Sequence, residues 1–373
     1  MIVKSLGLQN FRNHIDTNIL FSDSFNIIYG DNGQGKTNIL EAIYLCATGR
    51  SHRTSKDSEL IRFGSNAFNV NTSVSIGGLE KNISIDYLMD HKKQIKINEI
   101  PIKKIGSLLG NLYAVFFSPE DLFIVKQGPM ERRRFVDITL SQIRPSYFYN
   151  LQIFSKILKQ RNMLLKNANL KSEVFDTIDV WNAKMSEVAT DIIIERQNFA
   201  KILSDLSQSQ HKIISSEKEI ILFKYNCSFQ TFNENEKSQI SQMYLSHLEK
   251  NISRDIAVGY TLIGPHRDDY DILINEKSLK TYGSQGQQRS AVLSLKIAEI
   301  ELIRNETGQL PVLLLDDVMS ELDENRQKYL MYGINNIQTF ITCTGITQYQ
   351  SLQKDMVKYF KVENGKVINS YEK

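Results

Sequence analysis

The chain has 373 residues, of which 41% are hydrophobic and 23% are charged. This composition is typical of an ordinary folded protein, and it excludes a disordered tail, a collagen-like repeat and a small domain held together by disulfides. The formal net charge is only +3, so a contact to DNA or RNA would need local basic patches.

Cysteine and hydropathy patterns indicate the compartment. Cys46, Cys227 and Cys343 are widely spaced and form no CxxC pair, which predicts reduced thiols and no bound zinc. No run of 18 apolar residues occurs, and the first eleven residues lack the apolar region of a signal peptide. We therefore expect a cytoplasmic protein with no membrane partner.

The first third of the chain consists of short apolar runs around one glycine-rich turn. Phe25–Tyr29 is typical of a buried strand, and Thr37–Ala47 carries apolar residues at helical spacing. A hairpin turn is predicted at Asn98-Glu99. Three further segments alternate as half-buried strands do: Val70–Ile76, Ile83–Leu88 and Gln94–Ile97.

Helical spacing dominates from about Phe148 to Leu206, and strand patterns return after about Ile256. The later elements are strands at Tyr260–Ile263, Asp271–Ile274, Val312–Leu315 and Thr339–Cys343, a helix at Gln287–Arg304, and a hairpin of Tyr359–Glu363 with Lys366–Ile368. This order predicts an α/β fold with a helical insertion. The expected lobes are residues 1–120 with 256–373, and residues 121–255.

A phosphate-binding pattern, G-x-x-x-x-G-K-[ST], stands between a predicted strand and a predicted helix. Backbone N–H groups of such a loop surround an anion, and the helix N-terminus adds its dipole. We expect Lys36 to reach the β- and γ-phosphates of ATP from a solvent-filled site, and the Thr37 hydroxyl to bind Mg²⁺. The loop comprises Gly30, Asp31, Asn32, Gly33, Gln34, Gly35, Lys36 and Thr37.

Two acids follow the apolar run Val312–Leu315. A buried strand would deliver Asp316 at its carboxyl end, where it can hold Mg²⁺ across from Thr37. Asp317 then stands where a carboxylate can orient or deprotonate the attacking water. Lys36 and Asp317 are therefore the predicted catalytic residues.

A second anion site is predicted at Gly283–Arg289, directly before a strong helix. One chain offers no second nucleotide to this site, so we expect it to close over the γ-phosphate bound by another copy. Its residues are Ser284, Gly286, Gln287 and Arg289. A turn containing Ser320 and Asp323 is expected to contact the partner across the same interface.

Five ordered motifs together resemble the RecF family, the recombination and repair branch of the ABC/SMC-type ATPases. They are GDNGQGKT (30–37), FSPEDL (117–122), GPHRDD (264–269), GSQGQQR (283–289) and LLLDDVMSELD (313–323). The resemblance covers nearly the whole chain. It implies an ABC-type ATPase head, which is a P-loop NTPase fold, with an inserted helical second lobe.

The resemblance also implies site residues, partners and activity. Arg12 is expected near the nucleotide, and Asn32 and Lys36–Asn38 are expected at its phosphates. Members are expected to form an ATP-dependent homodimer on duplex DNA near single-strand gaps or junctions, and to help RecO and RecR load RecA. Weak, DNA-dependent ATP hydrolysis would reopen the dimer.

Departures from general ABC proteins predict slow turnover. Gly283 and Gln285 replace the leading Leu and first Gly of the usual signature. Asp317 stands where most ABC proteins carry a longer Glu, and Thr344 stands where they carry a switch histidine.

Two rival classes remain open. An SMC-type structural ATPase would need hundreds of heptad residues between the two halves of the head, and this chain lacks them. An ABC transporter ATPase subunit would lack an insertion of this form and would have a membrane partner.

Three basic clusters are candidates for phosphate-backbone contacts with DNA, and no pattern selects among them. The clusters are Lys92, Lys93, Lys96, Lys103 and Lys104; Arg132–Arg134; and Lys156, Lys159, Arg161, Lys166 and Lys171.

Overall fold

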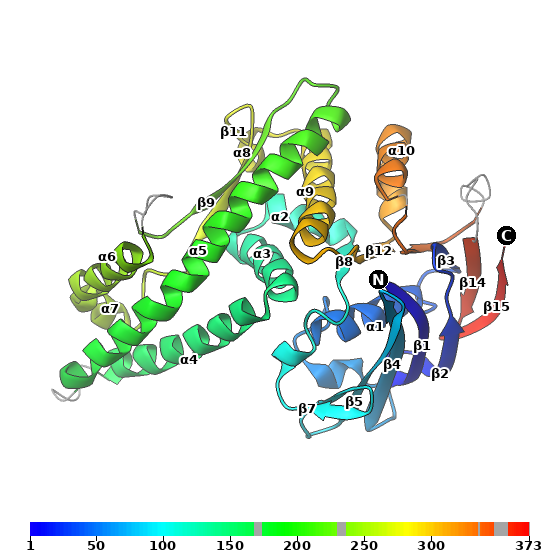
Figure 1. The fold of residues 1–373 in the computed structure, drawn as a ribbon, viewed down its shortest axis with the longest axis horizontal. Coiled ribbons are helices and arrows are strands. Elements are labelled where there is room, and N and C mark those ends of the chain that lie inside the picture. Colours follow the sequence, from blue (N-terminus) through cyan, green and yellow to red (C-terminus); the bar gives the residue numbers. More distant parts are fainter. Residues whose placement is uncertain (168–173, 230–235, 335, 347–356, 373) are drawn as a thin grey trace. The chain divides into compact units, whose positions relative to one another are not determined.

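The structure is a computed structural model that describes residues 1–167, 174–229, 236–334, 336–346 and 357–372. It divides into two compact units, one of Met1–Leu122 with Lys296–Lys373 and one of Phe123–Leu295 (Figure 1). The first boundary lies two residues from the expected one. The second differs from the expected boundary at 255/256, because β10 (Asp269–Ile274) is hydrogen-bonded along its length to β9 (Ile221–Asn226).

An antiparallel sheet forms one layer of the first unit, in the order β2-β1-β4-β5-β6-β7. Asn98 and Glu99 both have positive φ angles, 50° and 65°, as a two-residue hairpin turn requires. The predicted turn and the three predicted strands are confirmed. The strands are β1 (Ile2–Phe11), β2 (His14–Leu20), β4 (Ala67–Ile76), β5 (Leu79–Leu88), β6 (Gln94–Ile97) and β7 (Ile100–Ile102).

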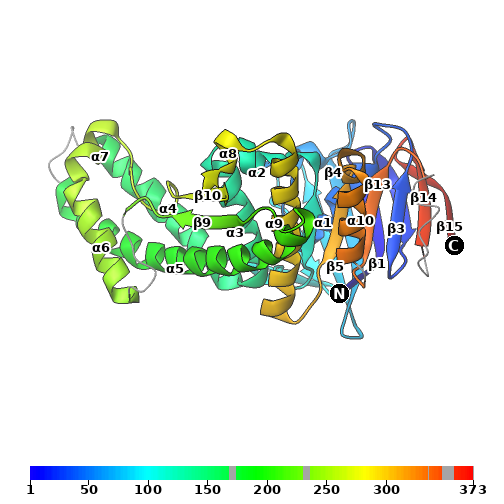
Figure 2. The same cartoon turned by 90° about the horizontal axis from the view of Figure 1, so that it is seen from above.

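A second sheet of the first unit has the order β15-β14-β3-β13-β12-β8, and all its pairs except β14–β15 are parallel. Strands β13, β3 and β14 lie side by side in Figure 2. Parallel strands have their carboxyl ends at one edge of a sheet. The residues that come after β3 and after β12 in the sequence therefore lie at the same edge. The strands are β3 (Phe25–Tyr29), β8 (Ala114–Phe117), β12 (Val312–Asp316), β13 (Thr339–Cys343), β14 (Val357–Glu363) and β15 (Lys366–Glu372).

Helix α1 (Lys36–Thr48) contacts strands of both sheets of the first unit. Its sequence KTNILEAIYLCAT is apolar on nearly every face, and all residues from Ile39 to Ala47 are buried, so the helix forms the centre of the core. It ends at Gly49, whose φ of 71° allows the N–H to bond Leu45 O. The unit also contains α10 (Glu324–Gly333).

The second unit is mainly helical, with a small sheet in the order β11-β10-β9. Strand β9 was not predicted. The predicted strand at Tyr260–Ile263 is wrong, because Thr261 bonds the Asn162 side chain through both its N–H and its hydroxyl. The helices are α2 (Phe123–Lys126), α3 (Pro129–Ile143), α4 (Pro145–Asn167), α5 (Val174–Ile214), α6 (Lys237–Lys250), α7 (Ile252–Val258), α8 (Leu279–Tyr282) and the first part of α9 (Gln285–Thr307); β11 is Lys277–Ser278.

Among the described residues, no helix is both long and apolar enough to cross a lipid bilayer.

Candidate nucleotide site and signature segment

The loop of residues 30–35 joins β3 to α1 and depends on glycine at both ends. Gly30 and Gly35 have φ angles of 149° and 111°, which side-chain-bearing residues rarely adopt. A Cβ at Gly30 would lie 2.3 Å from Val362 O, and one at Gly35 would lie 2.6 Å from Asn13 Oδ1. The glycines therefore allow the loop to pass closely against neighbouring backbone and side chains.

Lys36 is folded back onto this loop. Its Nζ donates to Gly30 O at 2.6 Å and to Asp31 O at 2.8 Å, and the residue is buried. The expectation of a side chain in a solvent-filled site is therefore wrong. Burial lowers the pKa of Lys36, although nearby acids including Asp317 oppose that shift. The ammonium thus occupies a partly desolvated position, in which an arriving anion would find it already close to the loop.

Thr37 and Asp316 meet as the sequence predicts. Thr37 Oγ1 donates to Asp316 Oδ1 at 2.8 Å, across 279 positions of sequence. A second hydroxyl, that of Thr342, donates to the same Oδ1 at 2.7 Å. Burial raises the pKa of Asp316, while these two hydrogen bonds oppose the shift.

The hydroxyl of Thr37 and the carboxylate of Asp316 fit a Mg²⁺ site. Mg²⁺ binds hard oxygen ligands and usually takes one or two carboxylates, with phosphates and waters completing its shell. The two side chains are already within hydrogen-bonding distance of each other. A cation at this place would also remove the cost of the buried charge on Asp316.

Asp317 is exposed and has a left-handed backbone, with φ of 53°. Its N–H donates to Thr342 Oγ1 at 3.0 Å, and its carbonyl oxygen accepts from Ser320 Oγ at 2.7 Å. Ser320 belongs to the 3₁₀ turn Val318–Glu321, and Asp323 caps α10 by accepting from Arg326 N. Ser320 and Asp323 are both exposed.

Other residues of the predicted loop make contacts that the motif does not specify. Asp31, Asn32 and Gly33 are exposed. Gln34 is tied to the β14–β15 turn, because its Oε1 accepts from Asn364 N at 2.6 Å. The loop is therefore braced against the turn that follows β14, the strand next to β3 in the sheet.

Asn13 connects the start of the chain to this loop. Its Nδ2 donates to Gln34 O at 3.0 Å, and its Oδ1 accepts from Asn38 Nδ2 at 2.8 Å. Asn38 is thereby held beside the loop by a residue that the phosphate-binding motif does not include.

Arg12 is paired with a buried acid. Its guanidinium donates two bonds to Glu41, at 2.7 and 2.9 Å, and one to Glu59 O. Burial by itself would raise the pKa of Glu41, but the bonds from Arg12 and Ser51 outweigh it and the pKa is lowered. Glu41 was not predicted as part of the site, although an acid within the apolar run ILEAIYL is itself a signal of a buried partner.

The signature segment in the second unit is closed by its own side chains. Ser284 Oγ accepts from Gln287 N at 3.2 Å, and Gln287 Oε1 accepts from Ser284 N at 2.9 Å. This reciprocal pair is a capping box at the start of α9. Ser284 is exposed, Gly286 and Arg289 are half-buried, and Gln287 also donates to Glu219 Oε1 at 2.8 Å.

Glu219 links this segment to the end of α5. Its Oε2 lies 3.0 Å from His211 Nε2, and His211 Nδ1 lies 2.9 Å from Ser294 Oγ. Burial lowers the pKa of His211, against the effect of Glu219. The Ser294 hydroxyl donates its own proton to Ser290 O at 2.8 Å, so His211 faces the oxygen of a hydroxyl that is already used as a donor. Sequence reasoning missed Glu219 and His211, since no local pattern marks either residue.

The predicted basic clusters divide into structural and exposed members. Lys93 pairs with Asp57 at 2.6 Å, Lys96 lies 3.8 Å from Asp86, and Arg132 pairs with Asp269 at 2.7 Å. Arg133 donates to Asp268 O, and the fully buried Arg161 pairs with Asp255 at 2.7 Å. The exposed members are Lys92, Lys103, Lys104, Arg134, Lys156, Lys159 and Lys166, and Lys171 lies outside the described residues.

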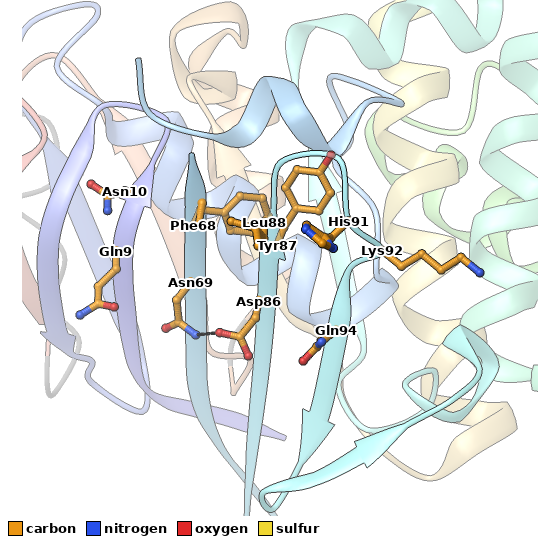
Figure 3. Close-up of a pocket in the computed structure, with 11 residues that line it drawn as sticks. Gln9, Asn10, Phe68, Asn69, Asp86, Tyr87, Leu88, His91, Lys92 and Gln94 are labelled. Carbon is orange, nitrogen blue, oxygen red and sulfur yellow. Dashed lines mark hydrogen bonds between the residues drawn. The ribbon is translucent and has the colours of Figure 1, made fainter. Parts of the chain in front are cut away.

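A pocket of about 330 Å³ lies at the β1, β4, β5 and β6 strands of the first unit. It is lined by polar side chains such as Asn69 and Asp86, which are hydrogen-bonded at 2.6 Å, and by the ring of Tyr87 (Figure 3). Lys92 borders the pocket and extends away from the other side chains drawn there. The predicted nucleotide residues are not among those that line it.

The fold and the site together define a P-loop ATPase head of the ABC type. A sequence profile of the RecF/RecN/SMC N terminal domain matches residues 2–368. The chain is 64% identical to the DNA replication and repair protein RecF of Ruminiclostridium cellulolyticum, over 98% of this chain and 99% of that one. It is 50% identical to the RecF of Acetivibrio thermocellus over the same shares. The chain belongs to the RecF/RecN/SMC family and, within it, to the RecF proteins.

Solved structures agree with this assignment. A structure of the recombination mediator protein RecF-ATP in the RecFOR pathway superposes with a TM-score of 0.91 at 38% identity, over 100% of this chain and 97% of that one. An SMC head from Pyrococcus furiosus superposes with a TM-score of 0.55 at 16% identity, which shows the shared fold alone. The predicted α/β ABC-type ATPase head is confirmed.

Proposed function

We propose that this chain is an ATP-driven DNA-binding switch of recombinational repair and replication-fork maintenance. ATP is bound at the loop of residues 30–37, and Mg²⁺ is held by Thr37 and Asp316. The metal, when bound, neutralises charge on the β- and γ-phosphates. The contact between Thr37 and Asp316 is the observation that carries the proposal, because it joins the two motifs that a P-loop ATPase needs at one place.

The residues of the chain have separate roles in this proposal. Lys36 exchanges its bonds to two loop carbonyls for bonds to phosphate oxygens, and Asn32 and Asn38 contact phosphates beside it. Asp317 orients the attacking water and accepts its proton. Hydrolysis is slow because the Asp317 carboxylate is one methylene shorter than glutamate and because Thr344 offers no imidazole.

Two copies of the chain close on ATP. In each copy the phosphate-binding loop and the signature residues Ser284, Gly286, Gln287 and Arg289 are separate anion sites, so two-fold symmetry lets each copy complete the other's site. Ser320 and Asp323 contact the partner along the same interface. Arg12 is expected near the nucleotide, after release from part of its pairing with Glu41.

Duplex DNA with single-strand gaps or junctions is the proposed substrate of the closed dimer. The proposed partners are RecR and RecO, with loading of RecA as the outcome. Support comes from the high similarity to RecF relatives along the whole chain and from the solved RecF-ATP structure described for the RecFOR pathway. We expect the chain to contact DNA through exposed lysines and arginines. The DNA affinity should therefore depend on salt concentration and little on the DNA sequence.

Sedimentation velocity tests the proposal, with and without ATP and Mg²⁺ and with and without gapped duplex. We expect a monomer to become a dimer with ATP and the dimer to bind the duplex. A protein with about six phosphate contacts loses on the order of 10³-fold in DNA affinity between 50 and 200 mM salt. An unchanged sedimentation coefficient with ATP, or DNA affinity that does not vary with salt, would contradict the proposal.

A further inference from the structure

One hydroxyl in the first unit bonds both Asp316, the last residue of β12, and the backbone of Asp317, the residue after it. Thr342 Oγ1 donates to Asp316 Oδ1 at 2.7 Å and accepts from the Asp317 N–H at 3.0 Å. We propose that Thr342 is a positioning residue for ATP hydrolysis, which fixes where the carboxylates of Asp316 and Asp317 stand. This inference rests on the proposed ATPase function and deepens it.

The sheet explains why this side chain reaches both acids. Strand β13 lies between β3 and β12, and Thr342 is in register with Asp316 on one side and with Ile28 on the other. Thr342 is only 1% exposed. Its hydroxyl donates its proton to Asp316 and accepts the N–H of Asp317 with a lone pair. A methyl group in the same place could do neither.

Asp317 needs such support because its backbone is held in an unfavourable region. A non-glycine residue rarely adopts the left-handed region and is retained there where surrounding contacts fix it. The bond from its N–H to Thr342 is one such contact, and the bond from Ser320 Oγ to its carbonyl oxygen is another. The backbone angle at Asp317 sets the direction of its side chain, so losing the Thr342 bond would displace the proposed base.

Thr342 and Thr37 differ in what a bound metal would do to them. Both donate to Asp316 Oδ1 in this structure. Thr37 is a proposed Mg²⁺ ligand, so its bond to Asp316 is exchanged when Mg²⁺ binds. The Thr342 bond needs no exchange, and it can hold Asp316 in one orientation before and after binding.

The test compares Thr342→Val with Thr339→Val. Thr339 lies on the same strand, is fully buried, and donates to Ile337 O at 2.9 Å, away from both acids. The valine at 342 should lower kcat for ATP hydrolysis about 10- to 150-fold, because a hydrogen bond to a charged group contributes about 1.5–3 kcal/mol. The control should keep kcat within about threefold, since its hydrogen bond joins neutral groups.

A binding measurement separates positioning from loss of fold. Affinity for a fluorescent ATP analogue in EDTA should be the same in wild type and Thr342→Val, whereas the gain in affinity on adding Mg²⁺ should be smaller in the variant. Thr342→Ser keeps the hydroxyl and should restore both the kcat and the Mg²⁺ effect. If the valine variant does not fold, Thr342→Ala supplies the same comparison, because a smaller side chain cannot clash.

Two results would overturn the inference: equal kcat in Thr342→Val and Thr339→Val, or a Thr342→Ser variant as slow as the valine variant. Failure of the proposed function would look different. In that case wild-type protein would itself neither bind nor hydrolyse ATP, whatever residue stands at 342.

Discussion

Arg12 holds the buried carboxylate of Glu41 through two hydrogen bonds, at 2.7 and 2.9 Å. Glu41 lies in α1 and its side chain is fully buried, whereas the Arg12 side chain is 20% exposed. The ion pair therefore connects the turn between β1 and β2 to the central helix that begins at the phosphate-binding loop. Because the acid is buried, the contribution of this pair to stability can be measured.

Arg12→Ala should destabilise the protein by about 3 kcal/mol, because it leaves the buried carboxylate with only the longer contact to Arg53, at 4.0 Å, as its cation. The folded-state pKa of Glu41 is lowered, so the stability that the pair contributes is present above the unfolded-state pKa. That contribution is lost as the pH falls through the folded-state pKa. Urea unfolding at several pH values measures both effects.

The exposed pair of Lys4 and Asp23, also at 2.7 Å, is the control for that experiment. Lys4→Ala should change the free energy of unfolding by less than about 1 kcal/mol, since exposed ion pairs contribute little. Equal effects of Arg12→Ala and Lys4→Ala would mean that Glu41 does not depend on its arginine.

Lys36→Met should weaken ATP binding about 10- to 100-fold, because it removes a charged donor to the phosphates. Stability should change by only about 1 kcal/mol, since the loss of two bonds to loop carbonyls is offset by removal of a buried ammonium group. Nucleotide titration and urea unfolding of the same variant check the two statements. The exposed Lys366→Met is the control, and wild-type affinity in Lys36→Met would remove the loop from the mechanism.

Local signals account for the parts of the fold and site that sequence predicted well. The strands Phe25–Tyr29 and Thr339–Cys343 were predicted at their observed bounds, because an apolar run between turns has few other ways to be buried. The loop of residues 30–37 was recognisable because its glycines, lysine and hydroxyl must stand at fixed spacing. The segment Tyr260–Ile263 has a similar apolar pattern, but its backbone bonds to a side chain of α4 instead of a strand.

Residues that act through distant partners were not predictable in the same way. Thr342 meets Asp316 across 26 positions, and Glu219 meets Gln287 across 68. A threonine in a strand is ordinary, and so is a single acid before a strand, so neither residue type carries a signal. The spacing of the basic clusters also did not show that two of their members, Arg132 and Arg161, pair with acids that are distant in the sequence.

His266 should make the protein less stable as the pH falls from about 6.5 to about 4. Burial lowers its pKa to about 4 in the folded state, and its Nε2 lies 3.0 Å from Thr261 O. The unfolded chain takes up the proton first, so the free energy of unfolding decreases by up to roughly 3 kcal/mol over this window. His266→Gln should flatten that part of the stability curve, whereas the exposed His91→Gln should leave it unchanged. A curve of unaltered slope in His266→Gln would rule out this histidine as the source.

Ser284→Arg should leave ATP binding to the monomer intact and prevent ATP-dependent dimerisation and hydrolysis. The arginine would stand at the exposed start of α9, where a partner's γ-phosphate is proposed to dock. Lys36, Thr37 and Asp316 are untouched in this variant. Light scattering with and without ATP measures the dimer. A variant that dimerises and hydrolyses normally would show that the protein works as a single-site ATPase.

Glu219→Ala should weaken the ATP-dependent dimer without changing ATP binding by the monomer. Glu219 accepts from Gln287 with one carboxylate oxygen and faces His211 with the other, so it holds the capping box of the signature segment against the end of α5. Without Glu219, Gln287 loses a charge-assisted hydrogen bond that contributes about 1.5–3 kcal/mol. Because the segment that carries Ser284 is then held less firmly, we expect the affinity of the dimer to fall about 10- to 150-fold. Lys218→Ala, at the exposed neighbouring residue, is the control and should dimerise like wild type. Sedimentation equilibrium with ATP gives both dissociation constants. Equal constants in wild type and Glu219→Ala would mean that the signature segment is ordered by its capping box alone.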